Sequence, residues 1–178
     1  MKKSYVYLLT TFMLWGSLYV VSQFVLGKIP TFTVAMFRYL IAFIALSLIS
    51  LKSEKEKIEK SDYKYFFIMG FIGYFISVDC QLLGTKIAGG SMASLINSLN
   101  PVIISVMAMI ILNEKSEMNK IVGIVLSLAG VYMIIGTGAN IQFLGVLISF
   151  IAVIGWAFMS VISRKISNKY SALTLTKV

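Results

Sequence analysis

The chain has 178 residues, of which 58% are hydrophobic and 13% are charged, and its formal net charge is +9. Soluble domains carry charges at about a quarter of their positions, so these few charges cannot cover a surface that faces water. The composition excludes an ordinary soluble domain and predicts a protein embedded in the lipid bilayer.

The residue types also limit which reactions the protein could catalyse and which groups it could bind. The sequence has no histidine, which removes the commonest metal ligand and the usual catalytic base. Cys80 is the sole cysteine, which excludes an internal disulfide and a CxxC metal motif. The basic residues lie between apolar runs instead of forming a patch interleaved with aromatic residues, which argues against a nucleic-acid partner. We expect no catalytic residue, no metal and no cofactor, and an intramembrane enzyme is disfavoured.

Six apolar segments are each long enough, at about 20 residues, to cross a bilayer as a helix. The only long connection, residues 52–63, is charged and is interpreted as a solvated loop or short surface helix. The expected fold is therefore all-α, a polytopic membrane protein with six transmembrane helices. The segments cover residues 5–26, 31–51, 64–85, 91–112, 119–138 and 141–163.

Lysine and arginine are strongly biased to one side of this arrangement. If the N-terminus is inside, the cytoplasmic stretches hold thirteen of them, whereas the outer stretches hold Lys28 and Lys86; Arg38, within a helix, is not counted. Positive charges accumulate in cytoplasmic loops. The pattern predicts a multi-pass protein of the cell membrane with a cytoplasmic N-terminus.

Arg38 and Asp79 are ionisable residues within expected spans, where each costs at least ~2.5–3.5 kcal/mol on insertion scales. A rise of about 1.5 Å per residue places Arg38 roughly 12 Å below the outer edge and Asp79 roughly 9–10 Å below it. These depths are compatible with an ion pair, which would serve either helix packing or a substrate or gating role.

The stretch "SLINSLNPVII" places two asparagines and a proline in the middle of the fourth span. Proline removes a helical hydrogen bond, and in lipid the freed carbonyl must find another partner. One interpretation is a packing kink whose Ser and Asn side chains cap their own backbone. The other is a polar cavity wall that faces inward, formed by Ser94, Asn97, Ser98, Pro101 and Ser105.

Trp15, Tyr19 and Gln23 recur every four residues on one face of the first helix. Such a face either lines a cavity or packs against a neighbouring helix. The amide of Gln23 calls for a polar partner in either case.

The chain carries traces of an internal repeat. A shift of 141 residues lays the sixth helix on the first, and because it spans five helices the second copy would be inverted in the membrane. We therefore expect a first five-helix repeat over 1–140 and the first helix of a second, incomplete repeat over 141–178. On this interpretation the chain is a fragment or truncated product, or it assembles with a second chain. The matched pairs are Trp15 and Trp156, Val20 and Val161, Ser22 and Ser163, Lys28 and Lys169, and Thr33 and Thr174.

Two long stretches of the chain are "LLTTFMLWGSLYVVSQFVLGKIPTFTVAMFRYLIA" and "GGSMASLINSLNPVIISVMAMIILNEKSEMNKIVGIVLSLAGVYMII". In the combination of their motifs they resemble the EamA-type transporters of the drug/metabolite transporter superfamily. The family usually has Leu-Gly-Glu-Arg where this chain has Leu112-Asn113-Glu114-Lys115, a change that keeps the charges. The resemblance implies ten helices in two inverted repeats around a substrate cavity, and a structural role for Glu114. It also implies transport of amino acids, other metabolites or drugs, often outward.

The leading hypothesis is that the chain is the N-terminal part of a transporter that exports a small organic solute by alternating access. In it Arg38 would meet an anionic group, and Asp79 would be the proton site if transport is proton-coupled. The alternative is a non-transporting truncated membrane protein with a folding or partner-binding role. A small four-helix multidrug pump does not fit, because this chain has six expected helices and no acidic residue in the first of them. The candidate cavity residues are Trp15, Tyr19, Arg38, Asp79, Asn97, Asn100, Pro101 and Trp156.

Overall fold

The computed structural model describes residues 2–51, 56–113, 118–135 and 142–177, and all of its regular elements within these ranges are helices. One of them, η1, is a π-helical segment that joins α3 to α4 without a break. The elements in chain order are α1 (Lys2–Leu26), α2 (Thr31–Ser50), α3 (Tyr63–Ile68), η1 (Met69–Ile76), α4 (Ser77–Ala88), α5 (Gly90–Asn97), α6 (Asn100–Ile111), α7 (Met118–Ile135), α8 (Phe143–Ile166) and α9 (Ala172–Lys177).

Five of the six expected spans are confirmed as helices long and apolar enough to cross a membrane. They are Tyr5–Leu26, Thr31–Ser50, Tyr63–Ala88, Gly90–Ile111 and Phe143–Ile166. The sixth, expected over 119–138, corresponds to α7, whose described apolar stretch Met118–Gly130 is shorter than the others. The protein is therefore a multi-pass membrane protein, and the sixth crossing stays a prediction.

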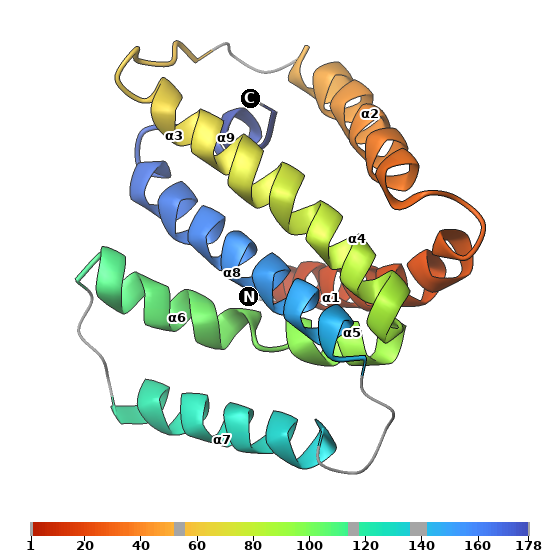
Figure 1. Ribbon diagram of the computed structural model, residues 1–178. Helices are drawn as coiled ribbons and strands as arrows, with labels where there is room; N and C mark the ends of the chain where they lie inside the picture. The colour runs from red at the N-terminus through yellow and green to blue at the C-terminus, as the bar shows by residue number, and fades with distance from the viewer. Residues whose placement is uncertain (1, 52–55, 114–117, 136–141, 178) are drawn as a thin grey trace.

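Helix α8 forms the centre of the molecule, with α4 and α6 beside it, while α7 lies at the lower edge of the view (Figure 1). Val153 and Ala157 of α8 are completely buried. The contact with α4 depends on small residues, since a Cβ added to Gly84 would lie 2.2 Å from Oγ of Ser149. Small residues are what allow membrane helices to approach this closely.

The π-helical segment was not anticipated from the sequence. It occupies "MGFIGYFI" in the middle of the third span, where π-helical turns leave backbone groups outside the regular α-helical pattern. The hydroxyl of Tyr39 on α2 donates a hydrogen bond to the backbone carbonyl of Tyr74 in this segment. The segment ends at Ile76, and the next residue, Ser77, lies on the cavity described below.

The fourth span is a broken helix. Helix α5 ends at Asn97, Ser98 and Leu99 form a turn, and α6 restarts at Asn100 with Pro101 in its first turn. Proline is well accommodated at that position, because the first N–H groups of a helix have no intrahelical partner. The kink expected from the sequence is therefore a full interruption of the helix.

Candidate functional site

A cavity of about 440 Å³ lies where α1, α2, α4, α5, α6 and α8 converge. Seven of the eight residues singled out in the sequence line it, and the eighth, Asp79, does not. Their lining of one cavity is a geometric fact, whereas solute binding by them stays a prediction. The seven are Trp15, Tyr19, Arg38, Asn97, Asn100, Pro101 and Trp156.

Aromatic rings form one wall of the cavity. The rings of Trp15 on α1 and Trp156 on α8 meet edge to face, with centroids 5.6 Å apart. Trp156 also meets Tyr74 edge to face at 6.2 Å. Such pairs are favourable beyond the area they bury, so they hold the indole rings in place at the cavity.

Tyr19 is tied to the third span. Its hydroxyl accepts a hydrogen bond of 2.6 Å from Nε2 of Gln81 on α4. One turn further along α1, Oε1 of Gln23 accepts the backbone N–H of Gly90 at 3.1 Å. The polar partner expected for Gln23 is thereby found, although Gln23 does not line the cavity.

The broken helix supplies a polar wall. Nδ2 of Asn97 donates to the carbonyl of Ala93 at 3.2 Å, and Nδ2 of Asn100 donates to Oδ1 of Asn97 at 3.0 Å. Hydroxyls of Ser94 and Ser98 donate to carbonyls of their own helix. Both interpretations of this stretch thus hold in part, since the side chains satisfy their own backbone and also line the cavity.

Two details differ from the expected polar stripe. Ser105 donates to the carbonyl of Pro101 at 2.7 Å and is not among the cavity residues. Oδ1 of Asn100 is buried with no hydrogen-bond partner among the described residues. The cavity wall therefore contains a hydrogen-bond acceptor, Oδ1 of Asn100, that has no donor among the described residues.

Arg38 is the one charged residue among the described cavity residues. Its Nη1 is buried without a hydrogen-bond partner. Within the described part of the chain, no carboxylate lies within 4 Å of it, and the expected ion pair with Asp79 is not formed. Asp79 lies on α4 with Oδ1 buried and likewise unpartnered. The similar depths were insufficient to predict contact, because depth says nothing about which way each side chain points around its helix.

Phe12, Ser77 and Gln81 line the cavity but were missed in the sequence. Ser77 and Gln81 are four residues apart and so share one face of α4, and Phe12 lies one turn before Trp15 on α1. This spacing was a usable signal. Gly16, Leu18 and Ala152 also line the cavity without having been candidates, whereas Ser94 and Ser98 belong to the polar wall that the sequence offered as one interpretation.

Two further points concern residues outside the cavity. Glu114, to which the resemblance gave a structural role, lies outside the described residues. Among the residues that the structure describes, no group of three or more His, Cys, Asp or Glu side chains could hold a metal ion.

The comparisons with known proteins agree with this architecture. The model of the EamA-like transporter family matches residues 2–136. The chain is 29% identical to the uncharacterized transporter YetK of Bacillus subtilis over 97% of its own length and 55% of that relative. It is 27% identical to an uncharacterized transporter of Clostridium kluyveri, covering 93% of the chain and 57% of the relative.

A third relative, an uncharacterized transporter of Archaeoglobus fulgidus, is 22% identical over 98% of the chain and 62% of the relative. The chain thus spans roughly half to three-fifths of the length of these curated relatives. It has no significant match among solved structures. Because the family model covers most of the chain, this protein belongs to the EamA-like transporter family, whose members are transporters rather than enzymes.

Proposed function

We propose that the chain forms one wall of the solute pathway of an alternating-access transporter that exports an amino acid or another small metabolite from the cell. The cavity carries this proposal. Trp15, Pro101 and Trp156 lie near the middle of their respective spans, the depth at which transporters of this general kind bind solute.

The unmatched polar groups indicate the chemistry of the solute. An anionic group such as a carboxylate would give Arg38 the counter-charge that it lacks among the described residues. A donor such as an ammonium group would satisfy Oδ1 of Asn100. The two tryptophan rings would cover an apolar side chain that projects from these two groups. An amino acid has all three features.

A second wall is needed because the α1 side of the cavity is open. Trp15 is 52% exposed and Phe12 is 69% exposed. We infer that further helices or a second chain complete the pathway. In support of an inverted repeat, a shift of 141 residues brings Lys2–Leu26 of α1 to 143–167, close to Phe143–Ile166 of α8. The same shift brings the start of α2 at Thr31 to the start of α9 at Ala172.

The proposal includes a cytoplasmic N-terminus, which the lysine and arginine distribution favours. Proton coupling through Asp79 remains part of it as well, although Asp79 does not line the cavity. Replacing Asp79 by asparagine tests this point. If Asp79 carries the coupling proton, the variant moves solute only downhill and no longer responds to a proton gradient.

The test of transport is a solute screen in proteoliposomes. The chain alone is compared with a form extended by further helices, for uptake and export of amino acids, other carboxylates and uncharged metabolites. The proposal predicts transport of a carboxylated solute by the extended form. If the extended form moves no solute, the proposal is wrong.

A matched pair of serines links transport to the cavity. Ser98 on the cavity and Ser127 on α7 both donate to a carbonyl of their own helix. Ser98→Ala and Ser127→Ala therefore remove the same kind of hydrogen bond. We expect only Ser98→Ala to change the apparent affinity, by about twofold to tenfold, as expected for one hydrogen bond.

A further inference from the structure

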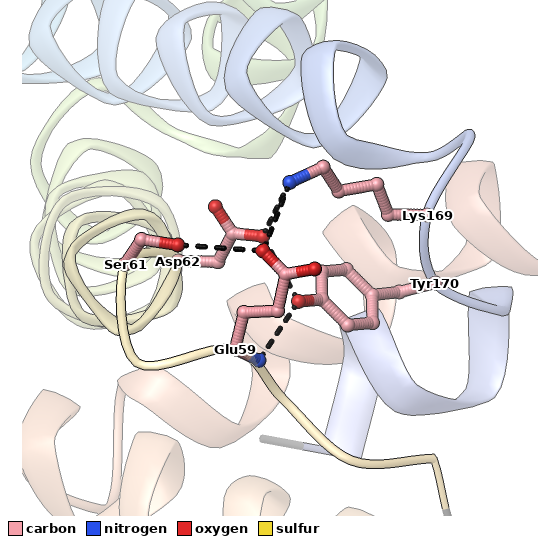
Figure 2. A network of polar contacts seen from close by, with 5 residues as sticks. All are labelled: Glu59, Ser61, Asp62, Lys169 and Tyr170. Carbon is pink, nitrogen blue, oxygen red and sulfur yellow. Dashed lines mark hydrogen bonds and ion pairs between the residues drawn. The ribbon is translucent and has the colours of Figure 1, made fainter.

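A group of polar side chains joins the segment before α3 to the turn between α8 and α9 (Figure 2). We call Glu59, Asp62, Lys169 and Tyr170 the clasp. Nζ of Lys169 lies 3.0 Å from Oδ2 of Asp62 and 3.4 Å from Oε2 of Glu59. The Tyr170 hydroxyl donates to Asp62 at 2.9 Å and accepts the backbone N–H of Glu59 at 3.1 Å. Four contacts thus join two segments more than a hundred residues apart in the sequence.

The clasp differs from an ordinary surface ion pair in its burial. The Asp62 side chain is 6% exposed, while Lys169 covers it from the solvent side at 53% exposure. Lys169 and Tyr170 hold the pKa of Asp62 below its usual range, and Asp62 raises the pKa of Lys169. A buried carboxylate that lost this lysine would lose its ion pair and keep only the longer-range charge of Lys64, so the contact favours the arrangement in which the two segments meet.

A second tie lies beside the clasp. The Glu56 carboxylate accepts the backbone N–H of Ser171 at 3.0 Å, immediately before α9. This hydrogen bond lowers the pKa of Glu56. Three successive residues of the turn between α8 and α9, 169–171, are therefore bound to the segment that precedes α3.

Beneath the clasp, apolar side chains close the space between α3, η1 and α8. We call Phe66, Met69, Met159, Ile162 and Ile166 the plug; all are buried and form one cluster with Tyr170. The rings of Phe66 and Tyr170 meet edge to face at 5.4 Å, which connects the clasp to the plug. Trp156 packs against the same cluster and lines the cavity. Cavity, plug and clasp thus follow one another along α8.

The opposite end of the cavity is built differently. The continuous helical run Tyr63–Ala88 starts at the clasp, so its end at Ala88 and the start of α5 at Gly90 lie away from it. A second hollow, lined by Ser91, Met92, Ser94, Leu95 and Ser98, shares Ser94 and Ser98 with the cavity and follows α5 toward that end. Buried side chains close the cavity at one end, whereas at the other end it adjoins the second hollow, with which it shares Ser94 and Ser98.

We propose that the clasp and the plug form the gate on one side of the solute pathway, and that the clasp must open for the cavity to reach that side. The inference rests on the proposed transport function and on the proposed orientation, in which this side is the cytoplasm. Alternating access requires each end to open in turn, and a few charged contacts at an interface can hold one of two arrangements. The clasp couples that arrangement to the position of the turn between α8 and α9.

The experiment measures access to the cavity instead of transport. In a Cys80→Ser background, Ser98→Cys places a thiol on the cavity, and a membrane-impermeant maleimide is applied from the clasp side or from the opposite side. Asp62→Asn and Lys169→Gln should each raise the labelling rate from the clasp side by about tenfold without raising it from the opposite side, because a shift toward the clasp-open arrangement cannot populate the alternative one. Equal labelling of wild type and variants from the clasp side would overturn the proposal. So would a rise from both sides, which would mean general loosening.

A cross-link keeps the proposal testable if the charge variants fold poorly. Asp62→Cys with Lys169→Cys, joined by a short thiol cross-linker in the same reporter background, should lower clasp-side labelling below the wild-type rate, and cleavage should restore it. Unchanged labelling after cross-linking would show a purely structural tie and overturn the gate. Lys165→Gln is the matched control, because Lys165 lies on the same end of α8 but over the Tyr65 ring at 5.5 Å. Labelling as expected with no solute transport would contradict the proposed function while the gate stands.

Discussion

Helices α1 and α8 agree in register but differ in environment. A shift of 141 residues aligns their ends and pairs Trp15 with Trp156. In the most apolar stretch of α8, 50% of the residues are buried inside the protein, whereas in that of α1 the share is 0%. Two helices with similar sequence patterns thus have different tasks: α8 holds the fold together, and α1 presents its side chains to the cavity and its surroundings.

The turns that follow α8 and α1 also differ in how they contact the rest of the protein. Lys169, after α8, lies within 4 Å of two carboxylates. Lys28, its counterpart after α1, has no such partner among the residues that the structure describes, and it is exposed. The turn after α8 is thus tied to the segment before α3, whereas the turn after α1 has no such ion pair among the described residues.

The largest difference in stability is expected between a glycine that packs against α8 and a glycine on α1, when each is replaced by leucine. Gly84→Leu would drive a side chain into α8, where Cβ alone would lie 3.0 Å from the backbone nitrogen of Ser149 and 3.2 Å from the carbonyl of Gly145. We expect a loss of about 3 kcal/mol in the free energy of unfolding. Gly16→Leu on α1, where a Cβ meets nothing within 4 Å, should change it by less than about 0.5 kcal/mol. Unfolding titrations in mixed micelles measure both, and equal losses would refute the contrast.

A smaller loss of unfolding free energy is expected when a buried hydroxyl is removed. Ser77 donates to the carbonyl of Ala152 on α8 at 2.7 Å, across a buried helix interface. Ser17 donates at 2.9 Å to Leu14 within exposed α1. Ser77→Ala should cost about 0.6 kcal/mol and at most about 1.7 kcal/mol, as measured for interhelical hydrogen bonds in membranes. Ser17→Ala should cost less than Ser77→Ala in the same titration; the reverse order would show that the α8 interface is not the stabilising one.

The smallest effect is expected from pH on the clasp. The pKa of Asp62 is lowered, so its contribution is present above its unfolded pKa and is lost only as pH falls through the folded value. The pKa of Lys169 is raised, so its contribution is lost only as pH rises through its folded value. Lys64 and Glu59 are the other charged neighbours of the pair. The ratio of clasp-side to opposite-side labelling of Ser98→Cys, which cancels the change of the reporter's own thiolate fraction with pH, should therefore stay constant from about pH 5 to about pH 9. A change within this window would place a titrating group in the gate that these contacts do not contain.

Much of the helical pattern could be predicted from the sequence. The apolar runs placed α1, α2 and α8 to within a few residues, because about 20 apolar residues in lipid have helix as the main solution. The spacing of Trp15 and Tyr19, and the polar residues around Pro101, pointed to residues that the structure brings to one cavity. Local patterns on single helices were sufficient for this part.

The features that depend on contacts between helices could not be predicted. Asp79 was grouped with the cavity because its depth matched that of Arg38, but its rotation around α4 takes it elsewhere. The π-helical segment accepts a hydrogen bond from Tyr39 on another helix, a contact that no local sequence pattern reveals. Asp62 looked like one charge in a solvated loop, and only the fold brings Lys169 beside it.

The most direct test of the central claim is transport of a carboxylated solute by two variants that each remove one positive charge. Arg38→Gln removes the charge on the cavity, and Lys28→Gln removes an exposed charge outside it. In proteoliposomes of the extended form, we expect Arg38→Gln to lower the initial rate at low solute concentration by about 100-fold, the size of a lost buried charge contact, while Lys28→Gln retains it. Equal rates for Arg38→Gln and wild type would contradict the assignment of this cavity as the solute site.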